Sequence, residues 1–156
     1  MPSNRQLLIA FALTCFALIG TAMYLQHVKE MLPCPRCVIQ RYAFIVGGAL
    51  ALVGAFMSRP KLWTGLSLLA MLFGAFNAAQ LIYVISNPSV SCGIDPVETM
   101  LNKIPTATYM PWLFRADGMC EAAGESFVGL PIPYWSLVWF AILSASLLFV
   151  LVRRRA

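Results

Sequence analysis

Four long apolar stretches, each free or nearly free of charge, constrain this chain more than any other feature of its sequence. They cover residues 7–25, 38–57, 62–85 and 134–152. An α-helix rises about 1.5 Å per residue, so roughly 20 residues cross the ~30 Å hydrocarbon core of a membrane. Only helices and closed barrels satisfy their backbone in lipid, and these runs lack the alternation of barrel strands. The sequence therefore predicts an all-α polytopic membrane protein, a bundle of four transmembrane helices.

Composition and length agree with this interpretation. The chain has 156 residues, of which 60% are hydrophobic and 11% charged, whereas a soluble domain carries about 25% charged residues. We expect one membrane domain over residues 1–156, with non-membrane loops at about 26–37 and 86–133. The first apolar stretch exceeds the roughly 7–15 residues of a signal-peptide core. We therefore expect an uncleaved helix there, with a cleaved signal peptide as the alternative.

The basic residues predict the orientation of the four helices. With both termini in the cytoplasm, six of the eleven basic residues and none of the six acids lie inside. Short cytoplasmic loops are enriched in Lys and Arg, so this orientation is the favoured one. The net charge of +5 is then a sign of topology and not of a nucleic-acid site. Both loops that carry paired cysteines, including the long second one, face the outside.

Four of the five cysteines fall in these two outer loops. Cys34 and Cys37 lie in the first loop, and Cys92 and Cys120 lie in the second. Disulfides persist in exported compartments and are rare in the cytosol. Four cysteines allow three pairings, and the sequence does not choose among them. Cys15 lies inside the first helix, where we expect a small apolar packing residue without chemistry.

The segment Cys-Pro-Arg-Cys is typical of a redox-active dithiol. Proline is favoured at the first helical position, so Cys34 would cap the second helix and Pro35 would begin it. Cys37 then lies in the first turn, near the positive end of the helix dipole, and Arg36 stands between the thiols. These features favour a lowered thiol pKa and higher reactivity. The alternatives are a static disulfide or a zinc site.

Zinc is less favoured by the spacing, because Cys92 and Cys120 are 28 residues apart and form no second close pair. We therefore expect no metal. Among the three alternatives, spacing and compartment favour the redox dithiol.

Arg41 follows Cys37 by four residues, one helical turn deeper on the same face. It is either an interfacial anchor that extends to the lipid headgroups or a donor to an electron acceptor dissolved in the membrane. Quinones fit the second role, because their carbonyl oxygens gain negative charge on reduction. We expect His27 to be interfacial, and Asn77 and Gln80 to form hydrogen bonds between helices.

The second loop contains two local patterns. Asp95-Pro96-Val97-Glu98 predicts a helix that begins after an acidic cap and runs to about Lys103. The run at 109–114, Tyr-Met-Pro-Trp-Leu-Phe, is too short to span a membrane but is apolar and aromatic. It predicts a segment at the membrane interface.

Several of these motifs together resemble the DsbB family, the disulfide bond formation proteins of the bacterial inner membrane. The resemblance covers nearly the whole chain. It is carried by Gln-His-Val at 26–28, Pro-Cys-Pro-Arg-Cys-Val-Ile-Gln-Arg at 33–41, Ser-Cys-Gly-Ile-Asp at 91–95, Gly-Met-Cys-Glu at 118–121 and Gly-Leu-Pro-Ile-Pro-Tyr-Trp at 129–135. It implies an integral inner-membrane thiol:quinone oxidoreductase that reoxidises a DsbA-like periplasmic oxidase and passes the electrons to ubiquinone or menaquinone.

The resemblance also implies roles for individual residues. Cys92 would form the mixed disulfide with DsbA and Cys120 would be its partner. Cys34 and Cys37 would be the pair nearer the membrane, with Cys37 contacting the quinone and Arg41 supporting that contact. A disulfide between Cys34 and Cys120 would be an intermediate.

One departure from the family concerns the outer end of the third helix. Some members carry a histidine there, but this sequence has none between Tyr83 and Pro88. No histidine role in quinone binding is carried over to this chain.

Other functions share parts of this pattern. A vitamin K epoxide reductase-like protein shares the four helices, the Cys-x-x-Cys motif and the quinone chemistry. A DsbB paralogue dedicated to a single substrate is a further alternative. A non-enzymatic membrane protein with static disulfides or a zinc site is the alternative from another class. An inward electron carrier would need cysteines reachable from the cytoplasm, and only Cys15 is available on that criterion.

Overall fold

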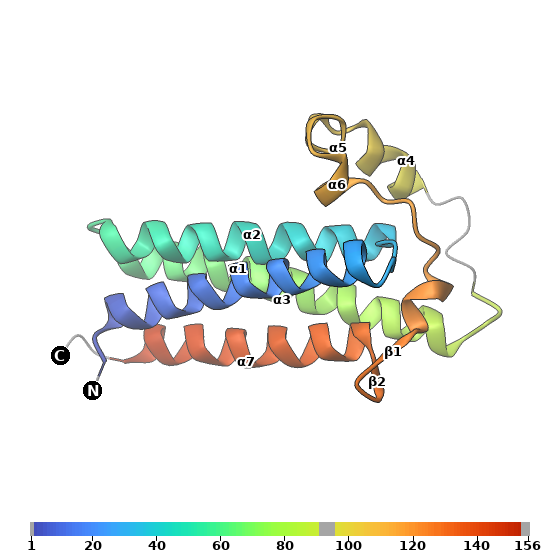
Figure 1. Ribbon diagram of the computed structural model, residues 1–156. Coiled ribbons are helices and arrows are strands. Elements are labelled where there is room, and N and C mark those ends of the chain that lie inside the picture. Colours follow the sequence, from blue (N-terminus) through green and yellow to red (C-terminus); the bar gives the residue numbers. More distant parts are fainter. Residues whose placement is uncertain (1, 91–95, 154–156) are drawn as a thin grey trace.

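Four long helices lie side by side in the computed structural model, which describes residues 2–90 and 96–153 (Figure 1). All four are long and apolar enough to cross a membrane. They are α1 (Asn4–Val28), α2 (Pro35–Phe56), α3 (Pro60–Ser86) and α7 (Ile132–Val152). The shortest has 21 residues, which at about 1.5 Å per residue matches the ~30 Å hydrocarbon core. The predicted all-α, four-helix membrane architecture is confirmed.

The helices extend beyond the apolar stretches where polar residues can still cap or continue them. Helix α1 begins three residues before Leu7, because Ser3 and Gln6 form a reciprocal capping box at its start. Helix α2 begins at Pro35, three residues before Val38. Hydropathy marks only the part of a helix that suits lipid, so it misses these polar first turns.

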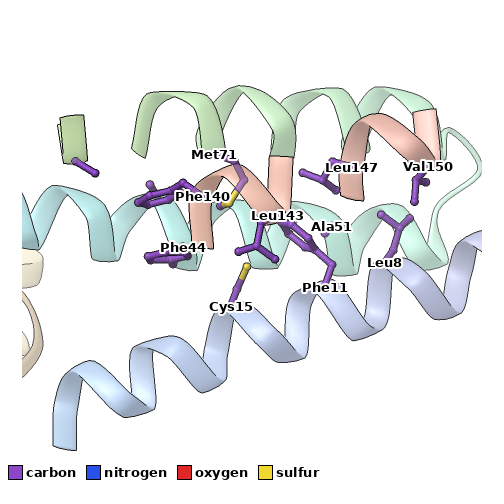
Figure 2. Close-up of a cluster of buried hydrophobic side chains, with 12 residues drawn as sticks. Leu8, Phe11, Cys15, Phe44, Ala51, Met71, Phe140, Leu143, Leu147 and Val150 are labelled. Carbon is purple, nitrogen blue, oxygen red and sulfur yellow. The ribbon is translucent and has the colours of Figure 1, made fainter. Parts of the chain in front are cut away.

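The core of the bundle is a cluster of apolar side chains between all four long helices (Figure 2). We call it the core cluster; its buried members are Leu8, Phe11, Cys15, Ala43, Phe44, Ala51, Met71, Ala78, Phe140, Leu143, Leu147 and Val150. Phe44 of α2 and Phe140 of α7 stack with ring centroids 4.1 Å apart. Gly74 of α3 lies against the Phe140 ring, which occupies the space a Cβ atom would need. Close approach at small residues is the usual basis of helix packing in membranes.

Cys15 is fully buried in the core cluster, as expected of a small apolar packing residue. It points toward the side chains of neighbouring helices (Figure 2).

Both connecting segments with cysteines lie at one end of the bundle, and the two termini lie at the other (Figure 1). We call these the loop end and the termini end. The second connection contains α4 (Pro96–Lys103), α5 (Pro105–Tyr109), α6 (Pro111–Phe114), the 3₁₀ helix η1 (Glu121–Gly124) and the hairpin strands β1 (Ser126–Phe127) and β2 (Leu130–Pro131). The predicted helix over 96–103 is confirmed, while its expected cap, Asp95, lies outside the described residues.

Helices α4, α5 and α6 pack on the first turns of α2. Tyr42 stacks on Phe114 with ring centroids 4.5 Å apart, and its hydroxyl forms a hydrogen bond with the Thr106 hydroxyl. The run 109–114 is divided between α5, which ends at Tyr109, and α6, which begins at Pro111. Tyr109 and Trp112 are exposed and Phe114 is buried, and the interfacial position of this run stays a prediction.

Candidate functional site

Cys34 and Cys37 form a dithiol at the first turn of α2. Cys34 is the N-cap residue and Pro35 the first helical residue, as the sequence predicted. The Cys34 sulfur accepts a hydrogen bond from the Cys37 backbone N–H at 3.2 Å. The two free thiols are in contact, with their sulfurs 2.6 Å apart. This is the juxtaposition that a reversible disulfide requires.

The two thiols have unequal surroundings. Cys34 is fully buried, whereas Cys37 is half-buried. The hydrogen bond with the Cys37 sulfur raises the pKa of the Cys34 thiol, and burial raises it further. The expectation of a lowered pKa is therefore wrong for Cys34, because a thiol that donates to its neighbour is held in its protonated form. Cys37 is left as the nucleophilic partner.

Arg36 is directed away from the dithiol. Its Nη1 atom donates a hydrogen bond to Oε1 of Gln80 on α3. Gln80 thus forms the predicted bond between helices. The same prediction is wrong for Asn77, whose amide donates to the Phe73 carbonyl one turn back in α3 itself, at 2.9 Å. That local bond satisfies the amide without a second helix.

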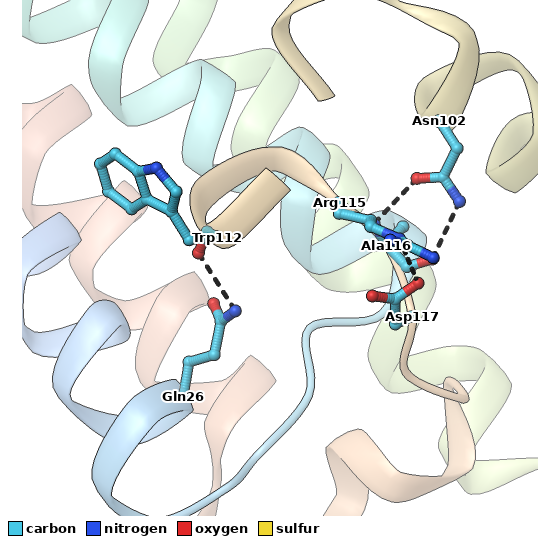
Figure 3. A network of polar contacts seen from close by, with 6 residues as sticks. All are labelled: Gln26, Asn102, Trp112, Arg115, Ala116 and Asp117. Carbon is cyan, nitrogen blue, oxygen red and sulfur yellow. Dashed lines mark hydrogen bonds and ion pairs between the residues drawn. The ribbon is translucent and has the colours of Figure 1, made fainter. Parts of the chain in front are cut away.

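Arg41 is buried at the loop end, with only 6% of its surface exposed. Its Nη1 atom donates to Oε1 of Gln26 at 2.7 Å and to the Leu113 carbonyl at 2.8 Å. Gln26 in turn donates to the Trp112 carbonyl at 3.1 Å (Figure 3). A side chain that extends to the headgroups would be exposed, so this geometry does not fit the anchor alternative.

The guanidinium of Arg41 retains unused donors. All of its hydrogen bonds within the described part of the chain start from Nη1, so Nε and Nη2 have no acceptor there. No carboxylate among the described residues forms an ion pair with it. A buried cation without a counter-ion is costly in a membrane and is typical of a functional site.

A cavity of about 680 Å³ lies at the loop end between α1, α2 and α7. Helices α1 and α7 pack against each other less closely than α1 packs against α2 or α7 against α3. Cys37, Gln40 and Arg41 line it from α2, and Trp135 and Trp139 line it from α7. An apolar and aromatic pocket with a few polar groups is typical of a site for a flat lipid-soluble molecule.

Sequence reasoning missed Gln40 and the two tryptophans. Gln40 is 4% exposed and lines the cavity. The available signal was helical spacing. Gln40 follows Cys37 by three residues, and Trp135 and Trp139 are one turn apart, so each set shares a face.

Cys120 lies next to the dithiol. It belongs to a buried cluster with Cys34, Leu81 and Val84, and Cys37 packs against this cluster. Cys120 is disulfide-bonded, whereas Cys34 and Cys37 are free. Cys92 lies outside the described residues, and its role stays a prediction. Three of the four predicted catalytic cysteines are therefore brought together.

The segment before Cys120 is held against the first loop by its backbone. The Gly118 N–H donates to the Pro33 carbonyl at 3.0 Å, and a Cβ atom at Gly118 would overlap the Leu32 carbonyl. Asn102 fixes the same segment through two hydrogen bonds with the Ala116 backbone, at 3.0 and 3.1 Å (Figure 3). Glycine at 118 allows the two cysteine loops to approach closely.

His27 and the zinc alternative fit this site less well. His27 is exposed and does not line the cavity. Within residues 2–90 and 96–153, no three His, Cys, Asp or Glu side chains form a group that could hold a metal ion. Cys120 is engaged in a disulfide, and a metal ligand must be a free thiolate.

Comparisons with known proteins identify the family of this chain. The family profile described as disulfide bond formation protein DsbB matches residues 4–150. The disulfide bond formation protein B of Herminiimonas arsenicoxydans is 46% identical, with both chains covered in full. Its counterpart in Ralstonia nicotianae is 42% identical, over 97% of this chain and 96% of that protein. The counterpart in Burkholderia pseudomallei is 36% identical over 97% and 92%. The chain therefore belongs to the DsbB family of disulfide bond formation proteins.

Proposed function

We propose that this protein reoxidises a DsbA-type periplasmic dithiol oxidase and passes the electrons to a membrane quinone. The observation that carries the proposal is the placement of the dithiol between two surroundings. Cys34 packs with Cys120 in one buried cluster, while Cys37 lines a cavity together with Arg41. A relay from an exported protein to a lipid-soluble acceptor needs contacts on both of these sides.

The first half of the relay exchanges disulfides. A thiolate of reduced DsbA attacks Cys92 of a Cys92–Cys120 disulfide, and the Cys120 thiolate leaves. The second DsbA thiol then displaces Cys92 and leaves DsbA oxidised, so that two electrons and two protons now reside on Cys92 and Cys120. Thiol–disulfide exchange proceeds through such mixed disulfides.

The second half returns the outer pair to its oxidised form. Cys120 attacks Cys34 of the oxidised Cys34–Cys37 disulfide, forming a disulfide between the loops and releasing Cys37. Cys92 then displaces Cys34, which restores the outer disulfide and leaves Cys34 and Cys37 as a dithiol. The contact of Cys34 with the Cys120 cluster supports this choice of attacked sulfur.

The dithiol is oxidised at the cavity. A quinone accepts two electrons and two protons, becoming a quinol, while Cys34 and Cys37 close their disulfide. Cys37 is suited to contact the acceptor because it lines the cavity and Cys34 does not. Arg41 holds positive charge beside the position where carbonyl oxygens gain electron density. Its unused Nε and Nη2 donors, and the aromatic walls, fit a quinone ring.

The proposed location is the bacterial inner membrane, with both termini in the cytoplasm and both cysteine loops in the periplasm. The basic residues Arg5, Arg59, Lys61 and Arg153 lie at the start of α1, at the connection of α2 to α3 and at the end of α7, which is the termini end. Cys34, Cys37 and Cys120 lie in or beside the two connections at the loop end. This separation matches the positive-inside rule and an oxidising compartment for the cysteines.

The test uses purified full-length protein in detergent with reduced DsbA and a short-chain ubiquinone. Quinone absorbance should fall with turnover, and Cys37→Ser and Cys92→Ser should each reduce the rate to background. Cys15→Ala is the matched control, because it changes a buried cysteine that does not line the cavity and should retain turnover. Turnover that survives Cys37→Ser or Cys92→Ser would contradict the relay.

A further inference from the structure

Gln40 is a buried amide with an unused donor at the proposed quinone cavity. It is 4% exposed, and its Nε2 atom has no hydrogen-bond partner within the described part of the chain. Burying an amide N–H without a partner is unfavourable, and native proteins retain few such groups. An unpartnered donor that lines a cavity is the expected sign of a ligand with an acceptor.

The other unpartnered buried atoms do not share this position. They are Nε of Arg36 and Oγ of Ser144, and neither residue lines the cavity. Of these three residues, only Gln40 lines the cavity. It also adjoins Arg41 in sequence and follows Cys37 by three residues, so the two polar side chains flank the thiol on the helix surface.

We propose that Gln40 donates a hydrogen bond from Nε2 to a carbonyl oxygen of the quinone headgroup. The inference rests on the proposed function and adds a second headgroup contact beside Arg41. Quinone carbonyls only accept hydrogen bonds, so an amide N–H is a suitable partner.

The amide also suits the reduced ligand. After reduction the ligand carries hydroxyl groups, and Oε1 of a glutamine can accept from them, whereas a guanidinium has no acceptor. Gln40 can therefore bond to the headgroup in both redox states, through Nε2 to the quinone and through Oε1 to the quinol.

The test measures quinone binding and not turnover. Full-length protein is purified in detergent, freed of bound quinone and titrated with ubiquinone-1 or, separately, menadione, with the thermal midpoint as readout. Gln40→Met keeps length and helix propensity but removes the amide. We expect its midpoint without quinone to equal or exceed that of the wild type, and its apparent Kd for quinone to rise about fivefold to tenfold, as for the loss of one hydrogen bond.

Ser144→Ala is the matched control. It removes Oγ of Ser144, another buried side-chain atom without a hydrogen-bond partner in the described part of the chain, which lies outside the cavity wall. This variant should leave the apparent Kd for quinone unchanged. Gln40→Asn gives an independent measurement should the Met variant fold poorly. It keeps the amide but withdraws it by one methylene, so its apparent Kd should also rise.

The outcomes separate the two proposals. A lower midpoint without quinone and an unchanged Kd in the Gln40 variants would make Gln40 a structural residue and overturn this inference alone. Wild-type protein that binds neither quinone would overturn the proposed function as well.

Discussion

The core cluster and the loop end are both buried, but they are built from different residues. The core cluster holds only apolar side chains, packed tightly enough that Gly74 leaves no room for a Cβ atom beside Phe140. The loop end buries Arg41, Gln40 and Cys34, and the cavity there is lined by Gln40, Arg41 and the half-buried Cys37. Polar groups at membrane depth cost stability. The difference indicates that the core cluster holds the bundle together and that the loop end carries the chemistry.

Replacing Arg41 should produce the largest effect short of removing a cysteine. Arg41→Met removes a charged donor at the cavity while keeping an unbranched side chain. Charge-assisted hydrogen bonds contribute about 1.5–3 kcal/mol, so the KM for quinone should rise roughly 10- to 100-fold. Steady-state kinetics with varied short-chain ubiquinone would measure this change.

Arg36→Met is the control for Arg41. Arg36 lies on the same helix but bonds Gln80 outside the cavity. Its loss should lower stability and leave the KM for quinone unchanged. Equal KM values for the wild type and Arg41→Met would return Arg41 to the role of a membrane anchor.

Two glycine substitutions should distinguish the two regions, because one should slow the reaction and the other should lower the stability. Gly118→Ala should push the Cys120 segment off the Leu32 carbonyl and slow DsbA-dependent turnover about tenfold or more, since small misplacements near reacting groups are costly. Oxidation of a chemically reduced Cys34–Cys37 pair by quinone should remain, measured in single turnover.

Gly74→Ala, in the core cluster, should lower the stability without slowing the reaction of the folded protein. Its Cβ atom meets the Phe140 ring, so we expect about 1–3 kcal/mol of destabilisation. Thermal or denaturant unfolding would measure this loss, and the folded fraction should retain both half-reactions. A slower first half-reaction in Gly74→Ala, with normal stability, would contradict the division between the regions.

The smallest expected effect is the order of thiol labelling. The hydrogen bond that Cys34 donates to the Cys37 sulfur raises the pKa of Cys34, and burial raises it further, so this thiol stays protonated as the pH rises through the ordinary cysteine value near 8.5. At pH 8, iodoacetamide should modify Cys37 at least several-fold faster than Cys34 in the reduced protein. Peptide mass spectrometry gives the ratio, and denatured protein should show nearly equal rates. Faster labelling of Cys34 would show that Cys34, and not Cys37, is the more nucleophilic thiol.

The four-helix architecture of this protein could be predicted from composition and spacing. Four uncharged stretches predicted four helices because lipid leaves the backbone few alternatives. Pro35 after Cys34 predicted the start of α2 for a local reason, the fit of proline to the first helical position. Such features depend on a few neighbouring residues and on the solvent.

Features that depend on distant contacts were not accessible in this way. The raised pKa of Cys34 follows from its contact with the Cys37 sulfur. The amide of Asn77 bonds to the Phe73 carbonyl of its own helix, and not to a neighbouring helix. The place of Gln40 in the cavity wall depends on how α1, α2 and α7 pack together, which no single helix encodes. The loop over 96–131 lacked periodicity because its short helices each bury only one or two side chains.

The most direct test of the relay isolates the inner pair from the outer one. Protein carrying Cys92→Ser and Cys120→Ser together is fully reduced, freed of reductant and mixed anaerobically with ubiquinone-1. We expect one equivalent of quinol per protein, with the loss of two free thiols at Cys34 and Cys37. Quinone that binds this variant but yields no quinol would contradict the assignment of Cys37 and Arg41 to the electron-accepting end of the relay.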